Sequence, residues 1–159
     1  MPDQTRHPSN SLKLSLPWFS GIITGIVSGI FLGLFLKVVQ TLTGEKVYTL
    51  LLNVDFVPGL PPRFPEWIEF SLHLAVSVVI GIFYIWWVRR TGRPVSRGIF
   101  LGAASSLLYL PLSPLSSRVP DLNDAGAIFY WVIGHLLFGA LLGLCGKYLH
   151  AKKRHAVHY

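Results

Sequence analysis

The stretch WFSGIITGIVSGIFLGLFL (residues 18–36) decides the fold, because its nineteen residues carry no charge and place glycine at every fourth position. A spacing of four puts these glycines on one face of an α-helix. Membrane helices associate through close packing, since lipid is as apolar as their side chains, and glycine lets two backbones approach. The stretch therefore predicts a membrane-spanning helix with a groove for a neighbour. The groove residues are Gly21, Gly25, Gly29 and Gly33.

The later apolar segments repeat this spacing of small residues. Such stripes predict which helix faces pack together, and they carry no information about chemistry. The residues that form the later stripes are Ser77 with Gly81, Gly98 with Gly102 and Ser106, and Gly139 with Gly143.

The composition places the whole chain in one membrane domain. The 159 residues are 52% hydrophobic and only 13% charged, which is too apolar for an ordinary soluble domain. The net charge of +7 does not indicate a nucleic-acid-binding protein, because the basic residues lie at segment ends, where they meet anionic lipid headgroups. The single cysteine, Cys145, excludes an intramolecular disulfide.

We therefore expect an all-α polytopic membrane protein, a four-helix transmembrane bundle with glycine-faced packing. The third segment is short, because the fifteen uncharged residues from 98 to 112 make roughly 22 Å of helix. It crosses the bilayer if Arg97 extends to one interface and residues 111–115 complete the other side. The predicted spans are residues 18–37, 66–88, 95–115 and 125–146, inside a membrane domain of residues 18–149. Residues 1–17 and the basic residues 150–159 are expected to be cytoplasmic tails.

The distribution of lysine and arginine predicts the orientation. With both termini in the cytoplasm, ten basic residues lie inside and four outside. Treating the third segment as re-entrant would instead export the basic C-terminal tail. The charges therefore favour four spans with both termini inside.

Ionisable groups within the spans are the first candidates for function, because their burial in hydrocarbon is costly without partners. Glu69, His73 and Ser77 follow one another at helical spacing in the second span, and His135 lies in the fourth. Two histidines with a carboxylate could relay protons or respond to acid. The alternative is that each imidazole only makes a hydrogen bond between helices.

No sequence motif indicates catalysis. HExxH, P-loop and GxSxG sequences and cysteine pairs are absent, so we expect no enzyme, no cofactor and no metal. The outer loops bring charged residues to one side of the membrane, where they form either a solvated rim or a site for an anion or a lipid headgroup. A lipid-headgroup enzyme at this face would need Asp121 or Asp124. The outer-face candidates are Arg63, Arg118, Asp121 and Asp124.

The order of several short motifs resembles the YagU-like family of bacterial inner-membrane proteins. The motifs are GLPPRFP (residues 59–65), His73, GIFLGA (residues 98–103), PLSP (residues 111–114) and Gly134-His135. The resemblance covers roughly residues 18–149, but this chain lacks the sizeable outer insertion of longer family members. It implies a multi-pass protein of the bacterial inner membrane and adds weight to Arg63, His73 and His135. It implies no defined activity.

The leading hypothesis is a non-enzymatic membrane protein whose Glu69, His73 and His135 form a polar core that responds to acidity. The alternative is a small oligomeric channel or transporter for protons, ions or a small solute. Expected partners are membrane lipids and a second copy of the chain or another helix-packing protein. Nucleic acid is not expected.

Overall fold

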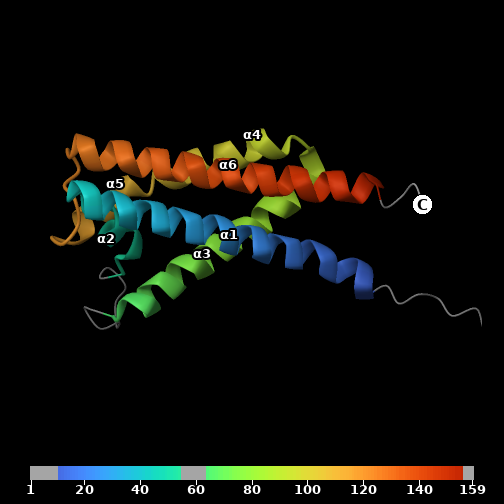
Figure 1. Ribbon diagram of the computed structural model, residues 1–159, viewed down its shortest axis with the longest axis horizontal. Coiled ribbons are helices and arrows are strands. Elements are labelled where there is room, and N and C mark those ends of the chain that lie inside the picture. The colour runs from blue at the N-terminus through green and yellow to red at the C-terminus, as the bar shows by residue number, and fades with distance from the viewer. Residues whose placement is uncertain (1–10, 55–63, 156–159) are drawn as a thin grey trace, which may run out of the picture.

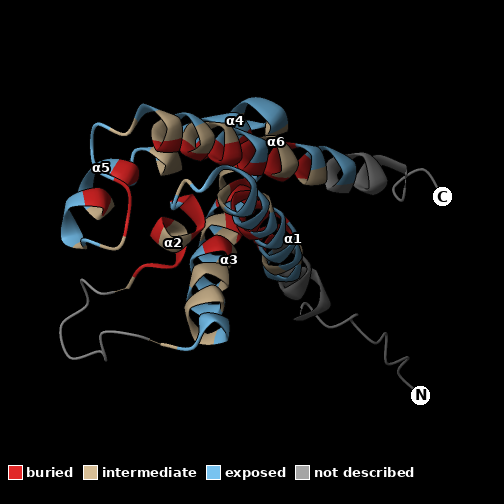
Figure 2. Ribbon diagram, turned by 60° about the vertical axis from the view of Figure 1, so that its left-hand side comes forward, coloured by how far each residue is buried: buried red, intermediate tan, exposed pale blue. Residues whose placement is uncertain are grey.

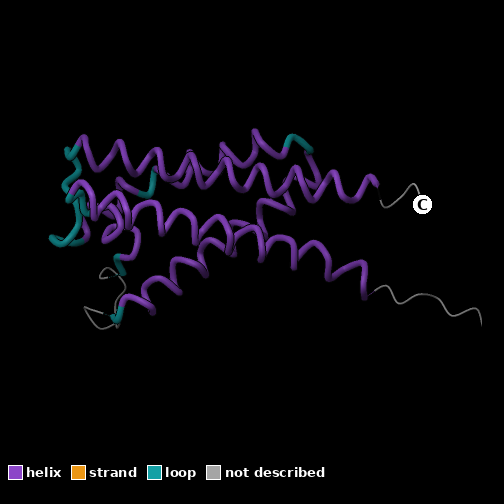
Figure 3. Tube along the Cα trace, in the orientation of Figure 1, coloured by secondary structure: helices purple, strands orange, loops and turns teal. Residues whose placement is uncertain are grey.

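The computed structural model describes residues 11–54 and 64–155, and this part of the chain is helices joined by short loops (Figure 3), with no strand. The prediction of an all-α fold is confirmed. The α-helices are α1 (Ser11–Thr43), α2 (Val47–Leu52), α3 (Glu66–Thr91), α4 (Pro94–Ser106), α5 (Tyr109–Leu112) and α6 (Ala125–His155), and a short 3-10 helix, η1 (Ser113–Leu115), follows α5.

Four segments are long and apolar enough to cross a membrane, which confirms the predicted multi-pass bundle. The third segment contains a break, because Leu107 and Leu108 form a turn between α4 and α5. Pro111 explains this break, since it has no N–H to donate to the carbonyl four residues earlier, at Leu107. The four segments are Trp18–Thr43, Glu66–Thr91, Pro94–Leu115 and Ala125–Tyr148.

The first helix is longer than the sequence predicts at both ends. It begins at Ser11, within the expected tail, and it ends at Thr43 instead of residue 37. The helix continues through Pro17, although proline donates no hydrogen bond and its ring crowds the carbonyl four residues earlier. Lys37 stays within the helix because its ammonium reaches a carboxylate on α3.

The long helices form two hairpins. In the first hairpin α1 crosses α3, and in the second the broken segment from α4 to η1 runs along α6 (Figure 1). The hairpins meet mainly where α1 packs on α6. The start of α1 and the end of α6 lie at one end of the molecule, and α2 and α5 lie at the other (Figure 1). Each hairpin therefore has the same direction and carries one short helix at its turn.

Each hairpin contains one close crossing of glycine backbones. A methyl group added at Gly81 would lie 2.6 Å from the backbone N of Gly25, and one added at Gly139 would lie 2.5 Å from the carbonyl oxygen of Gly98 and 3.1 Å from the backbone N of Gly102. Because each methyl group would come within 3.0 Å of backbone, neither fits unless the helices shift. The small-residue stripes on these helices thus lie where backbones meet.

All four stripe glycines of α1 face α3. Methyl groups added at Gly21, Gly25, Gly29 and Gly33 would meet Ile82, Ser77 with Val78, Ser77, and Phe70, respectively. The groove is therefore filled within the chain. It leaves no spare glycine face on this stripe for a second copy.

The short helix α2 is inserted between the hairpins at the turn end. Val47 and Leu50 are fully buried, and Figure 2 shows buried residues on α2 and on the inner side of α6. The run VYTLLL explains this position, because it brings apolar side chains to a gap that α3 leaves as it diverges from α6. The helix α2 forms one wall of the site described next.

Candidate functional site

A cavity of about 260 Å³ lies between the hairpins, near the end that holds α2 and α5. Residues from α2, α3, α6 and the α4–α5 segment line it, together with Leu32 of α1. Most of its wall is apolar, formed by side chains such as Leu72, Val76, Ile80 and Phe138. The polar residues in its wall are Asn53, Glu69, His73, Ser77, Ser105 and His135. The predicted polar core of Glu69, His73 and His135 thus shares one cavity.

Each histidine is held by a backbone carbonyl. His73 Nε2 lies 3.0 Å from the carbonyl oxygen of Gly29 on α1, and His135 Nδ1 lies 2.9 Å from the carbonyl oxygen of Trp131 on its own helix. Because a carbonyl only accepts hydrogen bonds, these ring nitrogens are the donors. In the neutral rings, His73 Nδ1 and His135 Nε2 are therefore hydrogen-bond acceptors.

Trp131 sets the orientation of His135. The Trp131 side chain is 1% exposed and its Nε1 donates to the carbonyl oxygen of Ser106 at 2.9 Å. Its ring centroid lies 4.3 Å from that of His135, which is 4% exposed. The imidazole is thus fixed by a backbone hydrogen bond on one side and by an aromatic ring on the other.

Among the described residues, Glu69 is the charged side chain in the cavity wall, and it is half-buried. No described lysine or arginine lines the cavity, although Glu69 also borders a neighbouring surface depression that contains Lys37 and Arg118. The wall also has a side that faces outward, because Val76 is 55% exposed and Leu108 is 46% exposed. These apolar residues lie within membrane-spanning segments, so the cavity opens toward the lipid.

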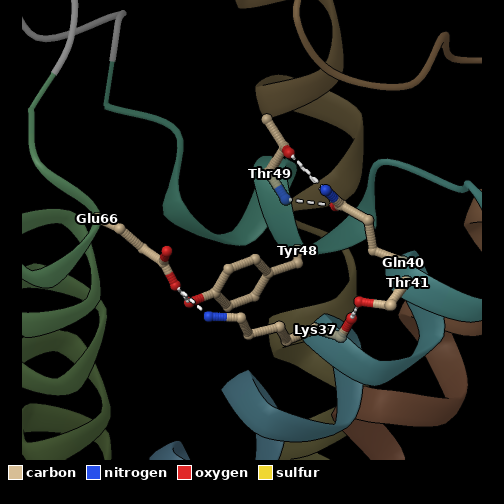
Figure 4. Close-up of polar contacts among 6 residues, drawn as sticks. All are labelled: Lys37, Gln40, Thr41, Tyr48, Thr49 and Glu66. Carbon is tan, nitrogen blue, oxygen red and sulfur yellow. Dashed lines mark hydrogen bonds and ion pairs between the residues drawn. The ribbon is translucent and has the colours of Figure 1, made fainter.

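A polar cluster at the turn end fixes the first hairpin around α2 (Figure 4). Lys37 Nζ forms an ion pair of 2.5 Å with Glu66 Oε1, and the Tyr48 hydroxyl donates to the same oxygen at 2.8 Å. Gln40 bonds Thr49, accepting from its backbone N–H at 2.9 Å and donating to its hydroxyl at 3.0 Å. Burial and the Glu66 carboxylate raise the pKa of Tyr48 above its ordinary value. The tyrosine therefore stays a donor and holds α2 against α3.

Two of the predicted outer-face residues, Asp121 and Asp124, lie close together before α6, where the backbone N–H of Asp124 donates to the carbonyl oxygen of Asp121 at 3.1 Å. Asp124 accepts from the backbone N–H of Ala127 at 3.0 Å, as an N-cap, and lies beside Glu45, while the Asp121 carbonyl accepts from Tyr109. Desolvation first and the Asp124 carboxylate second raise the pKa of Glu45. Arg118 lines a surface depression with Lys37 and Glu66. Arg63 lies outside the described residues, so its assignment stays a prediction.

The described residues include no cluster of three histidine, cysteine, aspartate or glutamate side chains placed to hold a metal ion. His73 and His135 are both available as neutral ligands, but a metal needs more donors than they provide. The arrangement instead offers an apolar space with hydrogen-bond acceptors and one carboxylate. That combination suits binding of a small molecule.

Sequence reasoning missed the contributions of α2, Trp131 and Ser105 to this cavity. Spacing along one helix brings Glu69, His73 and Ser77 together, but it does not show what a short helix inserts between hairpins. The position of Trp131 four residues before His135 was the available signal.

Comparison with known proteins found no match, either to a protein-family model, to a curated protein or to a solved structure.

Proposed function

We propose that this chain is a non-enzymatic membrane protein that binds a small, mainly apolar amine in the cavity between its hairpins. The observation that carries the proposal is the cavity wall, which combines apolar side chains with the Glu69 carboxylate and two imidazoles oriented as acceptors. The described part of this wall contains acceptors and a carboxylate but no lysine or arginine, which favours a cationic donor over an anion.

The size and the opening of the cavity support this class of ligand. A cavity of ~150 Å³ holds benzene, so 260 Å³ has room for one aromatic ring with a short side chain. The exposed Val76 and Leu108 give access from the lipid, where an apolar amine concentrates. An entry from lipid favours such a molecule over a strongly polar solute.

Acid is expected to weaken this binding. Protonation converts the acceptor nitrogen of each imidazole into a donor and adds positive charge beside the ligand ammonium. Glu69 is the other titratable group among the described residues of the cavity wall, and its protonation also removes attraction. The predicted response to acidity therefore takes the form of ligand release.

Binding of three ligands of similar size tests the proposal. Protein in nanodiscs would be titrated with 2-phenylethylamine, 2-phenylethanol and phenylacetate at neutral and acidic pH, and binding followed by calorimetry. We expect the amine to bind most tightly at neutral pH and the carboxylate least. Glu69→Gln should weaken amine binding about tenfold, because it removes a charge-assisted contact. Glu66→Gln is the matched control, since Glu66 lies on the same helix outside the cavity.

Equal affinity for the amine and the carboxylate would contradict the proposal, as would equal loss in the Glu69 and Glu66 variants. If the folded protein binds none of the three ligands, the alternative interpretation would be favoured, in which His73 and His135 contribute only to helix packing.

Transport of a small solute is the second candidate, because the cavity lies between two hairpins of like direction, as binding sites lie between the repeats of many transporters. Proton, ion and amine flux into proteoliposomes at acidic and neutral pH would test it. The comparison variant carries His73→Ala with His135→Ala. Flux that this variant loses would support transport, and the absence of flux in the folded native protein would exclude it.

We also propose that the protein lies in a bacterial inner membrane with both termini in the cytoplasm. The excess of basic residues at the end that holds the termini supports this orientation. Labelling of Lys152→Cys or Arg118→Cys, each combined with Cys145→Ser, would test it in intact cells. A membrane-impermeant reagent should label only the position at residue 118.

A further inference from the structure

Among the described side chains, those at the end that holds the start of α1 and the end of α6 carry charge of one sign. The described acidic side chains lie at or near the opposite end, around α2 and the start of α6. The described basic side chains at the terminal end are Arg89, Arg90, Arg93, Arg97 and Lys147.

A pocket of about 210 Å³ lies at this end, between the start of α1 and the end of α3. Its outer part is formed by guanidinium groups and indole rings, and its inner part by two isoleucines. The lining residues are Trp18, Ile82, Ile85, Trp86, Arg89 and Arg90.

Arg89 and Arg90 supply two guanidinium groups to this one pocket. Arg90 Cζ lies 4.3 Å from the centroid of the Trp86 ring, a cation–π contact that supports the guanidinium from one side. Both arginines are exposed. Among residues 18–54 and 64–148, no carboxylate is found in an ion pair with Arg89 or Arg90.

The pocket lies at headgroup depth. The second membrane-spanning segment, which α3 forms, ends at Thr91, directly after the two arginines. Trp18 begins the first membrane-spanning segment. Tryptophan is enriched at this level of a bilayer, where its ring meets both the acyl chains and the headgroups.

We propose that this pocket binds the phosphodiester of an anionic phospholipid. Guanidinium groups recognise phosphate oxygens in pairs, and a lysine or a single charge would not give the same geometry. The isoleucines and the exposed apolar residues of α1, such as Phe19 and Ile23, receive the acyl chains. The surrounding basic residues repel the choline of a zwitterionic lipid, which makes the site selective for a net negative headgroup.

Lipid retention in native mass spectrometry tests this site on the full-length protein. The native protein, mixed with equal amounts of phosphatidylglycerol and phosphatidylcholine of the same acyl chains, should retain phosphatidylglycerol preferentially. In the double variant Arg89→Gln with Arg90→Gln, the preference for phosphatidylglycerol over phosphatidylcholine should be about tenfold smaller. The matched control is Arg93→Asn with Lys147→Gln, which removes two charges from the same end but outside the pocket, and it should retain the preference.

Three results would overturn the proposal. Equal loss in both double variants would mean that charge alone attracts the lipid, and equal retention of both lipids by the native protein would mean that the site does not select an anion. Displacement of phosphatidylglycerol by millimolar glycerol phosphate or inorganic phosphate would identify a site for a small soluble phosphate.

A second double variant keeps the test valid if the glutamine double variant does not fold. Arg89→Lys with Arg90→Lys retains both charges but loses the paired donor geometry. Retention of phosphatidylglycerol should fall in this variant, and native-like retention would contradict recognition by guanidinium groups.

Discussion

The two hairpins use the same device to cross and then differ in the residue that follows it. In the first, Gly81 meets Gly25, and four residues further along α1 the carbonyl of Gly29 accepts from His73. In the second, Gly139 meets Gly102, and the carbonyl of Ser106, four residues on, accepts from a tryptophan. A ring N–H thus bonds the equivalent carbonyl in each hairpin.

The difference lies in chemistry. The first hairpin places an imidazole and the Glu69 carboxylate at the cavity, while the second places the indole of Trp131 at the equivalent position and adds His135 one turn later. The hairpins are alike where backbones cross and unlike where side chains face the space between them. The crossings therefore hold the fold together, and we propose that the function resides in the cavity.

The largest expected effect comes from blocking either crossing. Gly81→Val and Gly139→Val should each destabilise the protein by about 3 kcal/mol, because the added side chain meets backbone that cannot move without separating the helices. Thermal loss of helicity, followed by circular dichroism in detergent, measures this. Gly33→Ala is the control, since its methyl group meets only the side chain of Phe70. A large loss in one hairpin alone would show that the two crossings are not equivalent.

Removing the ring N–H should have a smaller effect, and an unequal one. His73→Phe should cost about 1 kcal/mol, the typical value of one hydrogen bond between membrane helices. Trp131→Phe should cost about 2 kcal/mol, because a buried side chain also loses volume. Chemical unfolding of the two variants compares them, and equal costs would indicate that burial adds nothing at Trp131.

Substitutions in the turn between the hairpins should change the free energy of unfolding only slightly, and in either direction. Arg93 has a φ of 56°, in the left-handed region that costs a non-glycine residue roughly 1 kcal/mol. Arg93→Gly should therefore raise the free energy of unfolding by about 0.5–1 kcal/mol. Gly92→Ala, at a φ of 68°, should lower it by a similar amount. A loss of stability in Arg93→Gly would mean that the arginine side chain holds the hairpins together.

The smallest effect is expected where the loops of the hairpins meet. Asp124→Asn keeps the cap on α6 but removes the negative charge beside Glu45, so the pKa of Glu45 should fall toward its ordinary value. A carboxyl whose pKa is raised in the folded state stabilises the fold less as the pH rises through that pKa. The variant should therefore lose less stability between acidic and neutral pH, and infrared titration of the carboxyl band would follow Glu45. An unchanged titration would show that desolvation alone raises its pKa.

The sequence predicts the bundle because its spans and stripes are local patterns. The glycines of residues 18–36 define a face before any partner is known, and the polar core of Glu69, His73 and His135 follows from their cost in hydrocarbon. The break at Leu107 also has a local cause, in Pro111. The position of α2 has no such signal, because VYTLLL, which has Thr49 among five apolar or aromatic residues, is equally typical of an interfacial segment. The pairing of the small-residue stripes depends on contacts between helices. The spacing of residues along one helix does not predict those contacts.

The pairing of the crossings within each hairpin bears on how the chain is made. Gly25 and Gly102 each meet the next long helix in the sequence, with only short helices in between. The first hairpin can close as soon as α3 enters the bilayer, while the second is still being synthesised. Biogenesis then becomes the docking of two preassembled units through α1 and α6. We therefore expect residues 1–92, released early from the ribosome, to insert and hold together without the rest of the chain.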